Sequence, residues 1–277
     1  MRLGVTIFLT DRTIGVAELA RETEARGFSS LWLPEHTHIP ASRRTPAPAG
    51  GDQLAEEYFR SLDPLVALAA AASVTERLVL GSGVSLVAQH HPIDYAKSWA
   101  TLDLLSGGRA RFGVGFGWNV EEMENHGIAY ATRREQVREH VLAMHELWAN
   151  DEAAYTGRFV NFDPVFMWPK PVQQPRIPTL VGGSAGPKMF AHVAEWADGW
   201  MPIGGRGIRD ALPALREAWS DAGRDGDPQV IPFGTVPSAE KLEYYESLGC
   251  TEVVVRLPAS GRDDVLAALD SFTPYLT

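Results

Sequence analysis

The stretch RFGVGFGWNVEEM, residues 111–123, decides which α/β fold the chain adopts, because three glycines separate an apolar run from a helical pattern. A dinucleotide-binding fingerprint needs G-x-G-x-x-G, and an acidic residue about 20 positions later at the end of the next strand. Trp118 stands where the third glycine is required, and the next strand-like run lies much farther along the chain. The stretch is therefore not such a fingerprint. Its glycines indicate backbone lying close to another group, with a plain strand-to-helix turn as the alternative.

Apolar runs alternate with amphipathic helical patterns on both sides of this stretch. Their near-continuous Val, Leu and Ile content is typical of strands in a buried parallel sheet. The runs are residues 3–8, 30–34, 77–87, 109–114, 177–183, 199–203, 229–236 and 251–258. Eight strand–helix units in this length predict a (β/α)8 TIM barrel, forming a single domain over residues 1–277. A doubly wound open sheet is the alternative, because alternation alone does not distinguish the two.

Two insertions interrupt the alternation. Residues 35–62 are rich in Pro, Ala and Gly, and residues 151–176 have the pattern of a small hairpin. Long connections in compact domains are usually lids or binding segments, or else disordered. In a barrel we expect both insertions at, or near, the strand ends whose loops build the active site.

Composition excludes several classes of partner. The chain has 277 residues, a formal net charge of -10 and scattered basic residues, which argues against duplex nucleic acid. No apolar run approaches the roughly 20 residues of a membrane span. A single cysteine, Cys250, excludes an internal disulfide, and the first residues lack a signal-peptide pattern, so we expect a cytoplasmic location. We expect a small-molecule substrate and allow for a homodimer.

The segment LPEHTH, residues 33–38, ends the second predicted strand with chemistry-bearing side chains. Glu35, His36 and His38 are potential metal ligands, but metal sites in barrels need further His or Asp at later strand ends. The later runs end in VGG, MPI, GTV and RLP, which provide none. We therefore expect no metal. A carboxylate beside an imidazole passes protons near neutral pH, so Glu35 and His36 are the catalytic candidates, with solvated loop residues as the alternative.

The segment GGSAG, residues 182–186, matches the G-x-S-x-G nucleophile elbow of serine hydrolases. In those enzymes an acid and then a histidine follow the serine. The only histidine after Ser184 is His192, two turns along the same predicted helix, so it cannot swing back as a base. A phosphate cradle of the backbone N–H groups of Gly182, Gly183 and Ser184 is favoured instead. A plain glycine turn and, more distantly, a serine hydrolase using Ser184 are the alternatives.

Taken together, these motifs resemble the bacterial luciferase-like flavin and deazaflavin oxidoreductases. The matching features are W-x-x-E-H at residues 32–36, LGSGV at 80–84, GVGFGWNVEE at 113–122, YTGRF at 155–159, PKPVQQPRIP at 169–178, GG at 182–183 and ADGW at 197–200. They follow one another in the family's order and cover nearly the whole chain.

The resemblance implies a (β/α)8 barrel that holds a flavin-type ring at its carboxyl-terminal mouth. The ring would lie against a third-strand bulge where family members carry a non-proline cis peptide. The glycines after strand four would let the backbone approach the cofactor. The implied cofactor-binding residues are Ser82, Gly83 and Val84 at the bulge, Asn119 near the cofactor chain, and Gly182, Gly183 and Ser184 at the phosphate.

Two branches of this family differ in cofactor. One uses coenzyme F420 for hydride transfer, and the other uses FMN for oxygen-dependent monooxygenation. The pair Glu35 and His36 favours the F420 branch, in which His36 would exchange the proton and Glu35 would orient it. Phe116 stands where a sugar-phosphate dehydrogenase branch has a catalytic glutamate, which argues against that substrate. The pattern does not identify the substrate.

Overall fold

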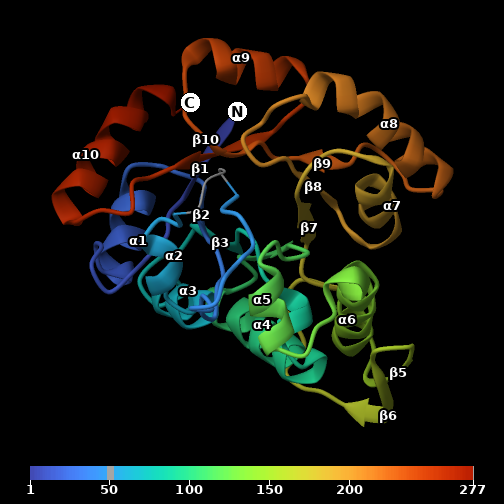
Figure 1. The fold of residues 1–277 in the computed structure, drawn as a ribbon. Coiled ribbons are helices and arrows are strands. Elements are labelled where there is room, and N and C mark those ends of the chain that lie inside the picture. Colours follow the sequence, from blue (N-terminus) through green and yellow to red (C-terminus); the bar gives the residue numbers. More distant parts are fainter. Residues whose placement is uncertain (49–52, 277) are drawn as a thin grey trace.

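The fold is built around one parallel sheet, described here for residues 1–48 and 53–276 of a computed structural model (Figure 1). Its strands are β1 (Arg2–Thr6), β2 (Ser30–Leu33), β3 (Val79–Ser82), β4 (Ala110–Val114), β7 (Thr179–Gly182), β8 (Gly199–Met201), β9 (Gln229–Val230), β10 (Phe233–Thr235) and β11 (Glu252–Arg256). The helices are α1 (Val16–Ala25), α2 (Glu57–Arg60), α3 (Pro64–Ala72), α4 (Pro92–Ser106), α5 (Val120–Asn125), α6 (Arg133–Ala149), α7 (Pro187–Trp196), α8 (Ile208–Asp221), α9 (Ala239–Ser247) and α10 (Arg262–Phe272). Short 3-10 turns are η1 (Val87–Gln89), η2 (Tyr130–Thr132) and η3 (Thr273–Tyr275).

The sheet closes into a barrel through the seventh predicted run, residues 229–236. The strand order is β10-β11-β1-β2-β3-β4-β7-β8-β9, so the two halves of this one run lie at the two ends of the order. Between them, the N–H of Ile231 donates to the carbonyl of Trp200 at 3.0 Å, and the N–H of Val254 donates to the carbonyl of Pro232 at 2.9 Å. One broken strand therefore joins β8 to β11. This confirms the barrel and excludes the open sheet.

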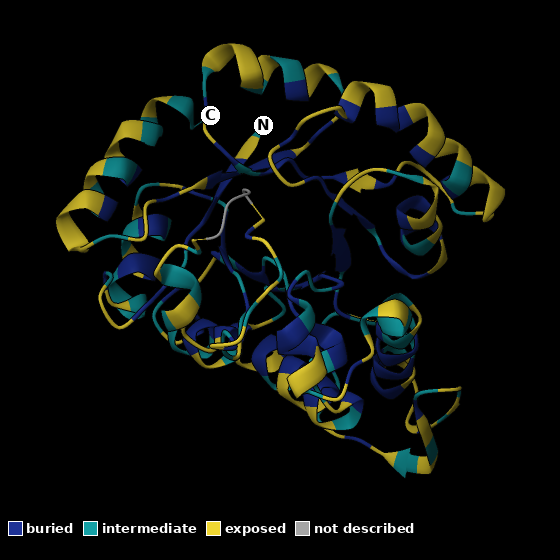
Figure 2. Cartoon of the chain, viewed as in Figure 1, coloured by how far each residue is buried: buried dark blue, intermediate teal, exposed yellow. Residues whose placement is uncertain are grey.

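Hydrophobic side chains pack in two places, as a barrel requires. Most buried residues form one cluster between the strands and the surrounding helices. A second, smaller cluster fills the barrel interior and comprises Trp32, Leu180, Met201, Ile231, Phe233 and Val254. Figure 2 shows the corresponding pattern, with buried strands in the centre and helices exposed on their outer sides.

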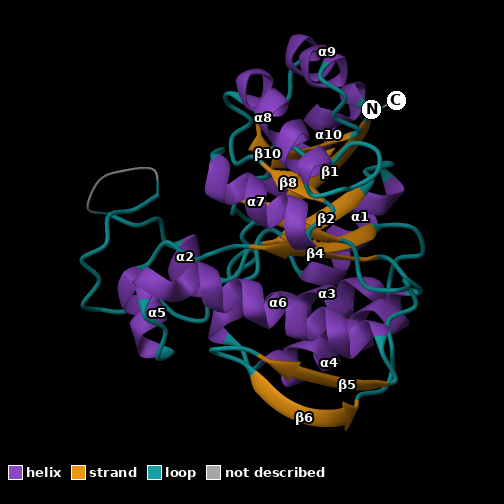
Figure 3. Cartoon of the chain, turned by 90° about the vertical axis from the view of Figure 1, so that its right-hand side faces the viewer, coloured by secondary structure: helices purple, strands orange, loops and turns teal. Residues whose placement is uncertain are grey.

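The first insertion covers the mouth of the barrel, where Figure 3 shows α2 and α5 projecting beyond the strands. Residues 49–52 of this insertion, like residue 277, lie outside the described residues. The second insertion contains the predicted hairpin, β5 (Glu152–Thr156) paired with β6 (Asn161–Phe166).

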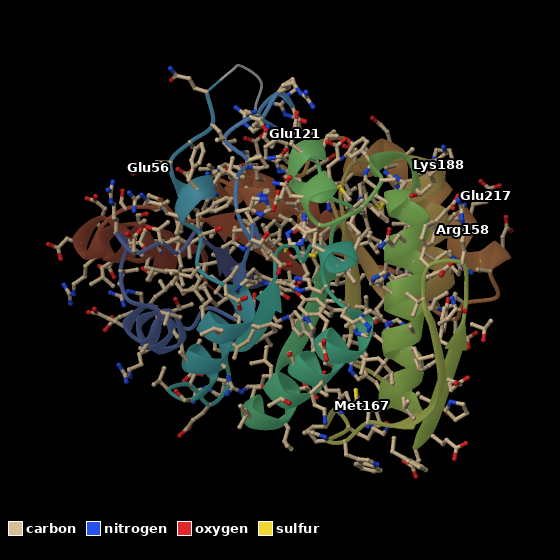
Figure 4. All side chains as sticks on the ribbon, turned by 60° about the horizontal axis from the view of Figure 1, so that its bottom comes forward. Glu56, Glu121, Arg158, Met167, Lys188 and Glu217 are labelled. Carbon is tan, nitrogen blue, oxygen red and sulfur yellow. The ribbon has the colours of Figure 1, made fainter. Side chains whose placement is uncertain are left out.

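The hairpin insertion does not reach the active-site end, contrary to expectation. It follows α6 and precedes β7, and therefore leads to the amino-terminal end of a strand. Gln173, for example, contacts Asp103 and the carbonyl of Ala110 at 2.7 and 2.9 Å. Figure 4 places Met167 at the end of the molecule opposite Glu121. Within the part of the chain that the structure describes, no helix has the length and apolar character to cross a membrane.

Candidate active site

One cavity opens at the carboxyl-terminal end of the barrel strands, where barrel enzymes bind their substrates. Its volume is about 570 Å³, and small-molecule sites usually measure about 300–1,000 Å³. Segments following β1, β2, β3, β4, β7 and β8, together with β10 and the end of β11, contribute to its wall. The predicted site residues that line it are Glu35, His36, Gly83, Val84, Gly182, Gly183 and Ser184.

The floor of the cavity includes a bulge at the end of β3, where a cis peptide bond joins Gly83 and Val84. The glycines of β4 accommodate this bulge. A β-carbon on Gly113 would come closer than 3.0 Å to the carbonyl oxygen of Ser82, and one on Gly115 would also come closer than 3.0 Å to the side chain of Val84. These glycines therefore allow β4 to pack closely on β3, and Gly115 also lines the cavity.

Two residues predicted to contact the cofactor, Ser82 and Asn119, have hydrogen-bond partners within the protein. The Ser82 hydroxyl donates to the carbonyl of Gly113 at 2.8 Å and accepts from its N–H at 3.0 Å. The Asn119 side chain caps α5 by accepting from the N–H of Glu122 at 3.4 Å. Neither is among the described residues that line the cavity. These bonds join β3 to β4 and cap the start of α5, whereas Nδ2 of Asn119 is buried without a hydrogen-bond partner among the described residues. The contact of either residue with a cofactor stays a prediction.

Glu35 and His36, predicted as one acid–base pair, belong to two separate pairs. His36 Nδ1 lies 2.8 Å from Oε2 of Glu122, whereas Glu35 Oε1 lies 2.7 Å from Nε2 of His90. The prediction that Glu35 orients His36 is wrong, because Glu122 occupies that position. Both carboxylates are buried, with side chains 3% exposed for Glu35 and 1% for Glu122. Each of the two cavity-lining residues therefore has its own partner that does not line the cavity, which gives two carboxylate–imidazole pairs where the sequence suggested one.

The hydrogen bonds of His36 define its tautomer. The indole N–H of Trp118 donates to His36 Nε2 at 3.3 Å, and an indole nitrogen can only donate. Nε2 is therefore the unprotonated nitrogen, and Nδ1 carries the proton that is donated to Glu122. The ring of Tyr58 lies 5.4 Å from the His36 ring and 6.1 Å from that of Trp118. His36 thus presents a basic nitrogen within an aromatic section of the cavity wall.

A second section of the wall carries the positive charges of Arg133 and Arg134, at the start of α6. Their guanidinium groups lie 3.6 Å over the Tyr130 ring and 4.3 Å over the Phe116 ring. Among the described residues, Arg133 Nε and one terminal nitrogen of Arg134 are buried without a hydrogen-bond partner. Buried donors of this kind normally have a partner, so the site favours an anion.

The titratable groups near these arginines indicate the same deficit of negative charge. Desolvation by burial, together with the charge of Arg133, lowers the pKa of Arg134. Desolvation and the charge of Arg134 lower the pKa of His192 to about 4. A bound anion would oppose both electrostatic effects.

The glycine loop after β7 offers fewer free donors than predicted. The N–H of Gly183 donates to the carbonyl of Met201 at 3.2 Å and is therefore already used. Ser184 is exposed, and neither its N–H nor its hydroxyl has a protein partner among the described residues. Of the three predicted residues, Ser184 thus has an N–H and a hydroxyl free for a ligand, and Gly183 has not.

Ser184 also lacks the base that a hydrolase needs. His192 Nδ1 accepts a hydrogen bond from the Trp196 indole N–H at 3.4 Å, and its ring lies 4.9 Å from that of Phe116. No histidine in residues 1–48 and 53–276 is hydrogen-bonded to Ser184. The arrangement therefore does not support the serine hydrolase alternative.

The insertion at residues 35–62 is tied to α5 beside the cavity. The Glu121 carboxylate accepts from the N–H of Arg44 at 2.8 Å and from the hydroxyl of Thr45 at 2.6 Å. These bonds, the Thr45 hydroxyl foremost, lower the pKa of Glu121 to about 2. Tyr58, from the same insertion, lines the cavity. Glu121 therefore holds the covering segment at the mouth, where Figure 4 shows it.

The described residues contain no group of three or more His, Cys, Asp or Glu side chains that could hold a metal ion. His38, the third candidate ligand in the sequence, is hydrogen-bonded to Thr37 and Asn125 at 3.0 Å each.

Comparison with known proteins identifies the family. The family model described as luciferase-like monooxygenase matches residues 11–249. The chain belongs to this luciferase-like family. An uncharacterized protein of Mycobacterium tuberculosis is 44% identical to this luciferase-like chain over 279 residues, covering 100% of it and 99% of the relative. An F420-dependent hydroxymycolic acid dehydrogenase of the same species is 27% identical, over 79% of this chain and 56% of the relative.

A solved structure agrees with the fold of this luciferase-like protein. The monooxygenase RslO1 from Streptomyces bottropensis superposes with a TM-score of 0.80 at 21% identity, covering 100% of this chain and 98% of that structure. At this identity the likeness supports the barrel architecture alone.

The sequence reasoning did not assign roles to Glu122, His90, Arg133 or Arg134. Glu122 ends the motif G-x-G-x-x-x-x-E at residues 115–122, so a signal for it was present. Adjacent arginines in the first turn of a helix are disfavoured by the helix dipole, which is a usable signal of an anion site. His90 lies 55 residues from Glu35 in the chain, so no local pattern in the sequence indicated that the two side chains form a pair.

Proposed function

We propose that this luciferase-like protein is an oxidoreductase that binds coenzyme F420, with FMN as the alternative cofactor. The ring would lie against the Gly83–Val84 bulge, and the phosphate would bind at Arg133, Arg134 and Ser184. The unpaired arginine donors are the observation that carries this proposal, since a phosphate supplies the acceptors they lack. The second ligand would be a small organic substrate within the aromatic section of the wall.

The choice of F420 over FMN rests on the 27% identical relative that is F420-dependent and on the imidazole–carboxylate pairs beside the bulge. Phe116 packs under Arg134, so it has a binding-site role in place of the catalytic glutamate of the sugar-phosphate branch. Lys188, at the start of α7, lies at the same end of the molecule as Glu121 in Figure 4 and is available to an anionic tail.

When bound, the deazaflavin ring supplies the hydride exchange, to or from the substrate. The residues of the chain supply the accompanying proton chemistry. His36 exchanges a proton with the substrate through Nε2, after the long contact to Trp118 gives way, and Glu122 keeps the proton on Nδ1. The segment held by Thr45 and Glu121 excludes water from the mouth, which strengthens these interactions.

Titration of the pure protein with F420 and with FMN, followed by fluorescence, tests the proposal. We expect F420 to bind the more tightly. Arg134→Ala should weaken binding roughly 10- to 100-fold, because a hydrogen bond to a charged group contributes about 1.5–3 kcal/mol. The matched control is Arg158→Ala on the exposed hairpin turn, which should leave affinity unchanged. Tight binding of FMN alone would change the assignment to an FMN-dependent monooxygenase, and binding of neither cofactor would refute it.

A further inference from the structure

The structure places Glu35 and His90 between the cavity and the outside of the barrel. Glu35 lines the cavity beside the bulge, and its side chain is 3% exposed. One carboxylate oxygen accepts from the N–H of Leu86 at 2.6 Å, and the other lies 2.7 Å from Nε2 of His90. Since the carboxylate can only accept, Nε2 of His90 carries the proton in this contact.

The orientation of the His90 ring is fixed from one side. The ring stacks on Tyr95 with centroids 3.9 Å apart and planes 2° apart, and the Tyr95 hydroxyl donates to Ser85 at 2.8 Å. The His90 side chain is 24% exposed. No protein partner of its Nδ1 occurs in the described residues. The ring therefore has one nitrogen on Glu35 and a second nitrogen available to solvent.

The other carboxylate–imidazole pair has no comparable outlet. The side chains of His36 and Glu122 are 6% and 1% exposed. His36 uses both ring nitrogens on Trp118 and Glu122, and the remaining oxygen of Glu122 is buried without a partner in the described residues. A proton on His36 therefore has no route to water through its own partner.

Of the described titratable groups near His90, Glu35 is the one that carries a charge near pH 7. They are Glu35 from the end of β2, Tyr95 from α4, His126 after α5 and His140 on α6. Desolvation raises the pKa of Tyr95 and lowers the pKa values of His126 and His140. All three are consequently neutral near pH 7.

We propose that Glu35 and His90 carry protons between solvent and the cavity, with His90 acting through Glu35; this rests on the proposed oxidoreductase function. For inward transfer, water protonates Nδ1 of His90, the Nε2 proton passes to Oε1 of Glu35, and the resulting carboxylic acid delivers it to the cavity. The imidazole is then left with its proton on Nδ1, and it resets when Nδ1 returns that proton to water and Nε2 takes up another once its contact with Glu35 opens, with no net change in protonation. Outward transfer is the reverse, and no electrons move.

The kinetic test compares His90→Ala with His90→Gln. The glutamine amide can keep a hydrogen bond to Glu35 but cannot carry a proton. The probes are F420-loaded protein with menadione and with short secondary alcohols. We expect both variants to lose turnover about 10- to 100-fold with a pH-dependent deficit and nearly unchanged F420 affinity. Added imidazole should restore His90→Ala at least fivefold and leave His90→Gln slow. The control is His91→Gln, an exposed neighbour, which should retain wild-type rates.

A measurement on the cofactor-free protein tests the route without turnover. Nitrogen-15 NMR should show the Nε2 proton of His90 in a hydrogen bond that disappears in Glu35→Ala, which removes the acceptor. A signal insensitive to that substitution would overturn the proposal, and this result decides the matter if none of the probes is turned over. Full activity of His90→Gln would also overturn it, because positioning alone would then suffice. If the wild-type protein binds neither F420 nor FMN, the proposed function itself fails, and the proton route fails with it.

Discussion

Replacing Gly113 by alanine tests the close packing of β4 on β3 that forms the floor of the cavity. The new β-carbon would lie closer than 3.0 Å to the carbonyl oxygen of Ser82. That oxygen belongs to the backbone next to the bulge, so a side-chain rotation cannot relieve the overlap. The two strands would have to separate locally by roughly 1 Å.

The cost follows from the contacts that such a separation breaks. Ser82 Oγ makes two hydrogen bonds to the backbone of Gly113, at 2.8 and 3.0 Å. Their loss costs about 1 kcal/mol each, and inserting a methyl group into a tightly packed core costs about 1–3 kcal/mol. We therefore expect Gly113→Ala to lower the free energy of unfolding by about 3–5 kcal/mol, and the melting temperature by on the order of 10 °C.

Urea and thermal unfolding, followed by circular dichroism, measure this change. The matched control is Gly15→Ala, because Gly15 has φ -66° and no atom within 4 Å of the added carbon. The control should change stability by less than about 1 kcal/mol, because the smaller entropy of the unfolded chain opposes the poorer fit of alanine at the N-cap of α1. If Gly113→Ala melted within about 2 °C of wild type, the steric explanation of these glycines would be refuted.

Three further predictions concern the site and its surroundings. Glu122→Gln should lower turnover on the order of 100-fold with little change in cofactor affinity, because His36 loses the carboxylate that holds its tautomer. Steady-state kinetics with a reactive probe substrate measure this effect, and an unchanged rate would remove Glu122 from the mechanism. Glu121→Ala should release residues 44 and 45 and speed their amide hydrogen exchange. Glu124→Ala, on the same helix, is the control and should leave that exchange unchanged. Equal exchange rates in the two variants would contradict the role of Glu121. The free energy of unfolding should fall as the pH drops from about 6.5 toward 4, because His192 takes up a proton there in the unfolded chain but not in the folded one, where its pKa is about 4. His192→Gln should reduce this loss between pH 7 and 5 by about 1 kcal/mol, after allowance for the partial exposure of the ring. An unaltered pH profile of unfolding would contradict that pKa.

Several features of the site could be predicted because their signals are local. Glycines in LGSGV marked the bulge that holds the Gly83–Val84 bond, and GGS marked the loop that carries Ser184 into the cavity. The motif around Glu35 and His36 correctly placed both side chains at the mouth. Their partners could not be predicted in this way, since Glu122 lies 86 residues from His36.

The sequence by itself determined the alternation of strands and helices, the family, and which strand ends carry chemistry. These depend on periodicity, caps and motifs among residues that are near neighbours in the chain. Only the tertiary structure decided which residues meet: His36 with Glu122, Glu35 with His90, and Gly113 with Ser82. The physical reason is barrel closure, which brings the loops after distant strands to one mouth, where hydrogen-bond geometry and burial select partners that spacing along the chain does not encode.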